Sequence, residues 1–189
     1  MQARHFDPAP NNLVLVGLRG CGKSSVGRLV ARRLAWEFVD TDELIERKEG
    51  RTISAIFATD GEAGFREIER QAIEHAARGE HRVIAVGGGA VLLEANRRAL
   101  RAAGLCVWLT APPPELLRRL QADPHTATRR PALSRLPELA EIEKTLASRR
   151  PFYEALADQV LDTAGRTIAD VAQEVITFLQ CHLRPKEGS

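Results

Sequence analysis

One eight-residue segment near the N-terminus limits the folds open to this chain more than any other feature. Gly17–Ser24 reads Gly-Leu-Arg-Gly-Cys-Gly-Lys-Ser and matches G-x-x-x-x-G-K-[ST] in full. The apolar run Leu13–Val16 precedes it, and Ser25–Leu34 follows with apolar residues at helical spacing. A phosphate-binding loop of this type lies between a strand and a helix, and the flanking residues predict both elements. The segment therefore predicts nucleoside triphosphate binding. A dinucleotide fingerprint is excluded because it would need glycine where Ser25 stands.

The rest of the chain alternates predicted strands and helices. After the first strand, at 13–16, we expect strands at 36–40, 82–86, 105–109 and 159–162, and helices at 25–34, 42–49, 64–78, 94–103, 114–120, 137–157 and 167–181. This alternation predicts an α/β fold, a parallel sheet with helices on both faces. We expect one domain at 13–181 between flexible tails at 1–12 and 182–189. Prolines and arginines interrupt residues 123–137, which predicts a lid or a disordered loop.

Composition excludes several other classes of protein. The 27 lysines and arginines against 25 aspartates and glutamates give a net charge of +2, without the basic excess of a nucleic-acid binder. No apolar run is long enough to span a bilayer, and the first ten residues lack the apolar core of a secretory signal, so we expect a cytoplasmic protein. The three cysteines and five histidines show no disulfide framework or metal-ligand spacing.

The glycine-rich loop is expected to bind the nucleotide phosphates through its backbone N–H groups and the helix that follows. Lys23 would place its charge on the β- and γ-phosphates, and the Ser24 hydroxyl would ligate Mg²⁺. Cys21 is either a tolerated spacer or, beside a lysine and a helix N-terminus, a thiol sensitive to oxidation. The predicted phosphate-binding residues are Arg19, Gly20, Cys21, Gly22, Lys23, Ser24 and Ser25.

Two carboxylates follow the second predicted strand, in Asp40-Thr41-Asp42. On an extended chain, residues two apart face the same side, and ligands of open parallel sheets bind beyond the carboxyl ends of the strands. One carboxylate could hold magnesium through water, while the other accepts a proton from an attacking hydroxyl. The alternative is that Asp40 ends the strand and Asp42 caps the next helix.

Three later segments could contact an anionic substrate. Arg66 could bind a carboxylate through two parallel N–H donors while Glu69 orients it, although the spacing alone favours a surface ion pair. Gly87–Gly89 would let a ligand approach the backbone, unless they form a plain tight turn. Arg129-Arg130-Pro131 and the Arg149–Tyr153 segment could close over a transferring phosphate, or belong to a solvated basic loop.

Taken in order, these motifs resemble the shikimate kinase family over about residues 13–180. The resemblance implies an adenylate-kinase-like P-loop fold with a five-stranded parallel sheet in the order 2-3-1-4-5. It also implies phosphorylation of the 3-hydroxyl of shikimate by ATP with Mg²⁺, giving shikimate 3-phosphate on the route to chorismate and the aromatic amino acids. Helices at about 42–78 would bind shikimate, and a lid at about 121–137 would close over the nucleotide. We expect a monomer.

The resemblance also assigns roles to single residues of this chain. Asp42 would bind the shikimate hydroxyls and act as the base, and Lys23 and the lid residue Arg130 would assist transfer. The shikimate carboxylate would be held by Arg66 and Arg149. The loop Gly87–Gly89, called the glycine loop below, would lie beside them. The remaining assignments are Gly87, Gly88 and Gly89 to shikimate, Arg119 and Arg166 to the adenine side, and Ser24 and Asp40 to magnesium.

Some positions depart from the family pattern, and two other functions stay open. The segment between Arg119 and Arg130 is longer than in compact members, and Arg130-Pro131-Ala132-Leu133 stands where the family usually has R-P-L-L. Arg149-Arg150 leaves the register uncertain by one residue, with Pro151 and Tyr153 favouring Arg149. A kinase of another small polyol or acid, such as gluconate, would share the loop. A regulatory nucleotide-binding module would be expected to lack Lys23, Asp42 or the lid arginines.

Overall fold

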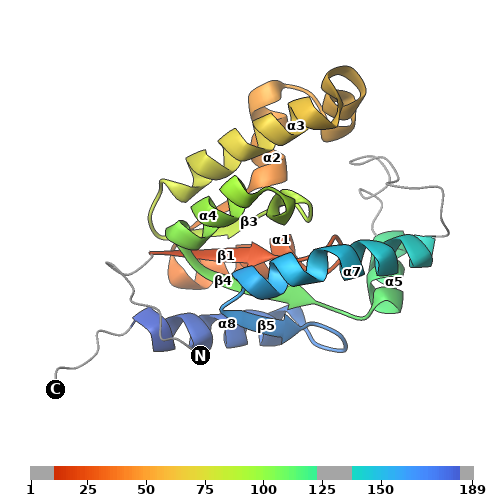
Figure 1. Cartoon of the computed structure of the whole chain (residues 1–189). Coiled ribbons are helices and arrows are strands. Elements are labelled where there is room, and N and C mark those ends of the chain that lie inside the picture. Colours follow the sequence, from red (N-terminus) through yellow and green to blue (C-terminus); the bar gives the residue numbers. More distant parts are fainter. Residues whose placement is uncertain (1–10, 123–137, 184–189) are drawn as a thin grey trace.

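A five-stranded parallel sheet forms the centre of the molecule (Figure 1). The structure, a computed structural model, describes residues 11–122 and 138–183. The strand order is β2-β3-β1-β4-β5, and every neighbouring pair is parallel. The predicted sheet and its order are therefore confirmed. The strands are β1 (Asn12–Val16), β2 (Glu37–Asp40), β3 (Arg82–Ala85), β4 (Gly104–Thr110) and β5 (Gln159–Asp162).

Helices connect the strands and cover both faces of the sheet (Figure 1). They are α1 (Lys23–Leu34), α2 (Thr41–Glu49), α3 (Ile53–Ala77), the short 3-10 helix η1 (Ala90–Leu92), α4 (Glu94–Ala103), α5 (Pro113–Ala122), α7 (Glu138–Leu156) and α8 (Ile168–Leu183). On one face α1 packs against α8, and on the other α4 packs against α3 while α7 contacts β4. None of the helices in the described part of the chain is long and apolar enough to cross a membrane.

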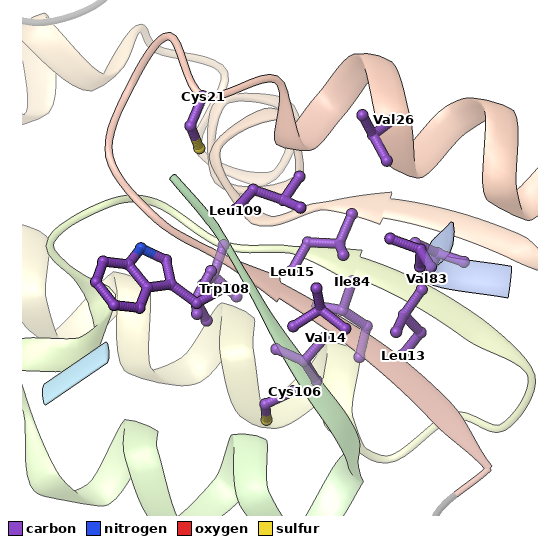
Figure 2. Close-up of a cluster of buried hydrophobic side chains, with 14 of the residues drawn as sticks. Leu13, Val14, Leu15, Cys21, Val26, Val83, Ile84, Cys106, Trp108 and Leu109 are labelled. Atoms are coloured by element: carbon purple, nitrogen blue, oxygen red, sulfur yellow. The ribbon is translucent and has the colours of Figure 1, made fainter. Parts of the chain in front are cut away.

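The central strands are buried on both faces, as short continuous apolar runs in a parallel sheet predict. All five residues of β1 are buried, and alternate side chains of β4 point to opposite sides. Cys106 of β4 faces α4, where its thiol lies 3.8 Å from the carbonyl oxygen of Leu100. Leu15 of β1 faces α1, and Figure 2 shows Leu15 and Leu109 on the side of Val26 with Cys106 on the opposite side. The resulting core fixes the ends of β1, β3 and β4 relative to one another.

The longest helical element, α3, consists of two segments joined at a kink, and only the second was predicted. α3 starts at Ile53 after Thr52, whose hydroxyl accepts the N–H of Ala55 at 3.2 Å and so caps the helix. Gly61, with φ 70° and ψ −176°, is not helical and forms a kink that joins two helical segments. The helix expected from about residue 64 agrees to within a few residues with the second segment, which follows Gly61, whereas the first segment, with the buried Ile53 and Ile56, was not predicted.

The edges of the other elements agree with the sequence to within a few residues. β1 begins at Asn12, which we expected in the N-terminal tail. The buried Asn12 side chain holds this residue in the sheet: its NH₂ group donates to the carbonyl oxygen of Gly79, and its side-chain oxygen accepts the Arg82 N–H. α8 continues to Leu183, into the segment expected to be a tail. Most of the predicted lid, including Arg130, lies outside the described residues, as do 1–10 and 184–189.

Candidate active site

The glycine-rich loop joins β1 to α1, as the motif predicts. Gly17 has φ 139°, and a side chain there would overlap the carbonyl oxygen of Leu109 on the neighbouring strand. Gly22 precedes α1 in the left-handed region with φ 93°, and it has no side chain with which to cap the helix. The N–H groups in the first turn of α1 are therefore available to an anion, which the helix dipole also favours.

Lys23 is held over the start of the loop. Its ammonium group donates to the carbonyl oxygens of Gly17 at 2.9 Å and Leu18 at 2.8 Å. Cys21, which lies between Leu18 and Lys23 in the chain, is only 1% exposed, and its sulfur lies 3.7 Å from the Lys23 ammonium nitrogen. Burial of this thiol limits access by an oxidant and favours the interpretation of Cys21 as a spacer.

The two aspartates of the Asp-Thr-Asp segment have different surroundings. Asp40 ends β2 and caps α2: one carboxylate oxygen accepts the N–H groups of Asp42 and Glu43, and the other accepts the Ser24 hydroxyl at 2.7 Å. Asp42 lies in the first turn of α2, not on an extended strand, so the predicted geometry was wrong. The helix begins one residue earlier than expected because Asp40, rather than Asp42, is its cap.

A large cavity of about 580 Å³ opens at the carboxyl ends of the strands. It brings together many of the residues predicted from separate motifs: Arg19, Gly20, Cys21, Gly22, Lys23, Ser24, Ser25, Asp40, Asp42, Gly87, Gly88, Arg119 and Arg166. The volume is in the range of small-ligand sites, and nearly all of the predicted phosphate, magnesium and adenine-side residues that the structure describes line it.

A smaller cavity of about 100 Å³ adjoins the large one, and the two share Arg19, Gly88 and Leu120. Arg66 and Arg149, the two arginines expected to bind a carboxylate, both line it. Arg150, the alternative register, pairs instead with Glu154 at 3.5 Å and lies over the Trp108 ring. The structure therefore places Arg149, and not Arg150, at the cavity. Its other lining residues include Leu18, Phe57, Glu62, Glu141, Ile142 and Thr145.

Arg66 is fixed by a buried carboxylate. Its Nη1 donates to Glu69 at 2.7 Å and its Nη2 to Glu62 at 3.1 Å, and the side chain of Glu69 is 0% exposed. A surface ion pair would leave Glu69 in water, so that alternative does not describe this pair. Burial lowers the pKa of Arg66, but the carboxylates of Glu69 and Glu62 outweigh it and raise the pKa above its usual value. Arg66 is therefore a permanent cation aimed by its partner.

The glycine loop lies against both arginines. A Cβ built on Gly89 would come within 2.8 Å of Nη1 of Arg66, and one on Gly88 within 3.5 Å of Nη1 of Arg149. The first glycine, Gly87, donates its N–H to the buried Thr41 hydroxyl at 3.3 Å. A side chain at Gly89 would displace the Arg66 guanidinium group, and one at Gly88 would be tight against the carbonyl oxygen of Gly17, at 3.3 Å.

The two arginines predicted to lie on the adenine side, Arg119 and Arg166, are anchored by residues that the sequence analysis did not single out. Arg119 donates to the hydroxyl and the carbonyl of Thr163, each at 2.8 Å, and to Glu115 at 2.7 Å. Arg166 pairs with Glu174 at 2.6 Å. Helical spacing of Glu115 and Arg119 could have indicated the first pair, and the place of Thr163 directly after β5 could have indicated the second contact.

Comparison with known proteins gives a consistent result. The sequence profile of the shikimate kinase family matches residues 19–180. A shikimate kinase of Symbiobacterium thermophilum is 47% identical over 169 residues, covering 89% of this chain and 96% of that protein. The structure of an Acinetobacter baumannii shikimate kinase in complex with shikimate superposes with a TM-score of 0.85 at 34% identity, covering 95% of this chain and 98% of the other.

More distant kinases share only the fold. A gluconokinase structure from Sinorhizobium meliloti has a TM-score of 0.56 at 20% identity, covering 91% of this chain and 93% of the other. This level of similarity carries no information about the acceptor. The family profile and the shikimate kinase relatives do carry such information, because they match this chain in sequence, at 47% and 34% identity for the two relatives described above. The chain belongs to the shikimate kinase family.

Proposed function

We propose that this chain transfers the γ-phosphoryl group of ATP to the 3-hydroxyl of shikimate, giving shikimate 3-phosphate for the synthesis of chorismate and aromatic amino acids. The observation that carries the proposal is the junction of two cavities. The larger one is built on the phosphate-binding loop, and the smaller one presents Arg66 and Arg149. A phosphate donor in the first and a small carboxylate in the second would meet at Gly88, which lines both.

The residues of the larger cavity support the transfer step. Loop N–H groups and Lys23 bind the β- and γ-phosphates and stabilise the charge that develops on them. The shikimate oxygen forms the new bond to phosphorus while the bond to the β-phosphate oxygen breaks, and ADP leaves. Asp42 accepts the proton of the attacking hydroxyl. In this assignment Asp40 is not the base, because its oxygens already accept hydrogen bonds from Ser24 and from the backbone of α2.

Ser24 and Asp40 fit a magnesium ion. Mg²⁺ prefers oxygen ligands and is usually held by one or two protein groups together with phosphates and waters. A hydroxyl and a carboxylate oxygen 2.7 Å apart, at the edge of the cavity beside the loop, meet that description. When bound, the ion would neutralise charge on the β- and γ-phosphate oxygens.

The smaller cavity supplies the acceptor specificity in this proposal. Arg66 and Arg149 bind the shikimate carboxylate, and the glycine loop admits the ring close to the backbone. Arg119 and Arg166 contact the adenine side of the nucleotide. Arg130, outside the described residues, is proposed as the lid arginine. The domain limits at 13–181, the cytoplasmic location and the monomeric state remain predictions.

Steady-state kinetics with the purified chain test the proposal directly. ATP, Mg²⁺ and shikimate should give a product heavier than shikimate by one phosphoryl group, identified by mass spectrometry. Gluconate in place of shikimate separates the two acceptor classes. Both acids carry a carboxylate that Arg66 and Arg149 could bind, but gluconate lacks the ring of shikimate. Turnover of gluconate above that of shikimate would contradict the proposal, as would nucleotide binding without turnover of either acid.

A further inference from the structure

Tyr153 of α7 connects the core to the glycine loop. Its side chain is 0% exposed, and its hydroxyl donates to the carbonyl oxygen of Gly88 at 2.7 Å. Its ring stacks on Trp108 of β4, with the ring centroids 5.4 Å apart and an interplanar angle of 22°. Tyr153 is thus held in place by the sheet. Its hydroxyl binds the backbone of Gly88, a residue that lines both cavities.

The loop needs such a restraint because of its composition. Three consecutive glycines have little steric preference for one backbone conformation. The N–H of Gly87 is bound by Thr41, but among the residues that the structure describes, no protein group accepts the N–H of Gly88 or Gly89. These two donors keep a fixed direction only if the peptide units that carry them are held from elsewhere.

The hydrogen bond from Tyr153 acts on one of these units. The carbonyl of Gly88 and the N–H of Gly89 belong to the same planar peptide, and in a trans peptide they point in opposite directions. Fixing the carbonyl toward the core therefore turns the Gly89 N–H away from Tyr153. The guanidinium group of Arg66 lies against the same glycine, so a change in this peptide unit would also be felt by Arg66.

α7 gives the contact a second consequence. Arg149 precedes Tyr153 by four residues in α7 and so lies on the same face of the helix. Its Nη1 would be 3.5 Å from a Cβ on Gly88. One hydrogen bond thus sets both the direction of the loop peptide and the distance between the loop and the helix turn that carries Arg149.

We propose that Tyr153 is a positioning residue for the acceptor site: its hydroxyl fixes the 88–89 peptide unit, and with it the Gly89 N–H and the place of Arg149. The inference rests on the proposed function and extends it. Tyr153 does not touch the reacting atoms, so its contribution is to the binding of the acid in the ground state and in the transition state alike. Such uniform binding appears in KM for shikimate, not in kcat.

The variant Tyr153→Phe tests this because it removes the hydroxyl and keeps the stacked ring. We expect KM for shikimate to rise about five- to tenfold, the size expected for losing one buried hydrogen bond, with kcat and KM for ATP changed by less than about twofold. Asn12→Ala is the matched control. It also removes buried side-chain hydrogen bonds to the backbone, one donated to the carbonyl oxygen of Gly79 at 2.6 Å and one accepted from the Arg82 N–H at 2.9 Å, but at the opposite end of the sheet.

Thermal unfolding of both variants separates positioning from stability. Each variant should unfold at a lower temperature than the wild type, and kinetics are measured well below both midpoints. A raised KM for shikimate in Tyr153→Phe alone supports the inference. Unchanged kinetics, equal changes in both variants, or failure of Tyr153→Phe to fold would overturn it, since each result describes a merely structural hydrogen bond. If the wild-type chain does not phosphorylate shikimate, the proposed function itself fails and the inference falls with it.

Discussion

Asp42 is the carboxylate in the large cavity to which we assign the proton of the attacking hydroxyl. Asp42→Asn removes the base while keeping the shape of the side chain, so kcat should fall by about 10²-fold or more while nucleotide affinity stays close to the wild-type value. A coupled assay and a nucleotide titration measure the two quantities. The control is Glu43→Gln on the same turn of α2, because Glu43 binds Arg28 through exposed contacts. Near-wild-type turnover of Asp42→Asn would refute the assigned role.

Arg66 offers a second test at the level of a single side chain. Arg66→Lys keeps the charge but loses the planar fork that can bind a carboxylate and Glu69 together. We expect KM for shikimate to rise roughly tenfold, in line with the loss of a charged hydrogen bond, and KM for ATP to change little. Arg70→Lys, one turn further along α3, is the matched control because Arg70 pairs with Glu67 and Glu74. Equal effects from both substitutions would mean that helix stability, and not carboxylate binding, is being measured.

The bend in α3 is a property of the element and decides where its second half points. Gly61 has φ 70° and ψ −176°, a conformation that only glycine adopts without strain, whereas Gly50 at the end of α2 has φ 63° and ψ 16°. A Cβ at either position would meet nothing within 4 Å, so alanine substitutions report on the backbone alone. Gly61→Ala should destabilise the fold by about 1–3 kcal/mol. Since the segment from Glu62 carries Arg66, it should also raise KM for shikimate.

Gly50→Ala serves as the comparison for that experiment. Left-handed alanine costs about 1 kcal/mol, so Gly50→Ala should lower the free energy of unfolding by less than Gly61→Ala does. It should leave both KM values unchanged, because the N-terminal end of α2 carries Asp42 and Gly50 lies at the other end. Chemical denaturation and steady-state kinetics on the two variants measure these differences. A Gly61→Ala protein with wild-type KM values would show that the bend is unimportant for the acceptor site.

Helix α5 carries an ion-pair cluster whose stabilising effect depends on pH. Hydrogen bonds from Arg118 and Arg119 lower the pKa of Glu115 from its usual 4.5 to about 2. Because the folded protein binds this proton more weakly than the unfolded chain, the cluster stabilises the fold fully above pH 4.5 and progressively less as the pH falls toward 2. The stability difference between wild type and Glu115→Gln, from urea unfolding, should therefore be constant near neutral pH and shrink below 4.5. Glu94→Gln, which breaks an exposed 3.7 Å pair, should show little difference at any pH.

The elements differ in how far the sequence could predict them. β1, the loop and α1 follow from a motif whose flanking pattern is local, and β5 agrees with its predicted bounds because turn residues mark both ends. The first segment of α3 was missed because Gly61, which forms the kink, interrupts the helical pattern. Asp40 and Asp42 were expected to face the same side of an extended segment, with Asp42 as the alternative cap, because the choice of capping residue depends on hydrogen bonds that the order of residues does not contain.

At the scale of the whole molecule, topology explains why the motifs could be predicted singly but their contacts could not. β1 lies between β3 and β4. The connection after β1 leads to one side of the sheet and the connection after β3 leads to the other, so a crevice opens at the carboxyl ends of these strands. This rule predicts that the loop, the Asp-Thr-Asp segment and the glycine loop meet there. It does not predict that Tyr153 reaches Gly88, or that Arg119 reaches Thr163, because these contacts depend on side-chain packing between elements distant in sequence.

Two adjoining cavities that share Arg19, Gly88 and Leu120 also predict how ligands stabilise the whole fold. A ligand that binds only the folded chain adds about 2.7 kcal/mol at a hundred times its dissociation constant, which corresponds to a rise in Tm of roughly 5–10 °C for a chain of this size. Mg²⁺–ADP and shikimate, added separately, should each raise Tm of the wild type. Arg66→Lys, with shikimate bound about tenfold more weakly, should lose about half of the shikimate shift and keep the nucleotide shift, and Lys23→Met should lose the nucleotide shift and keep the shikimate shift. If either substitution removes both shifts, the cavities do not bind their ligands independently, and the division of tasks between the phosphate loop and the arginine pair is wrong.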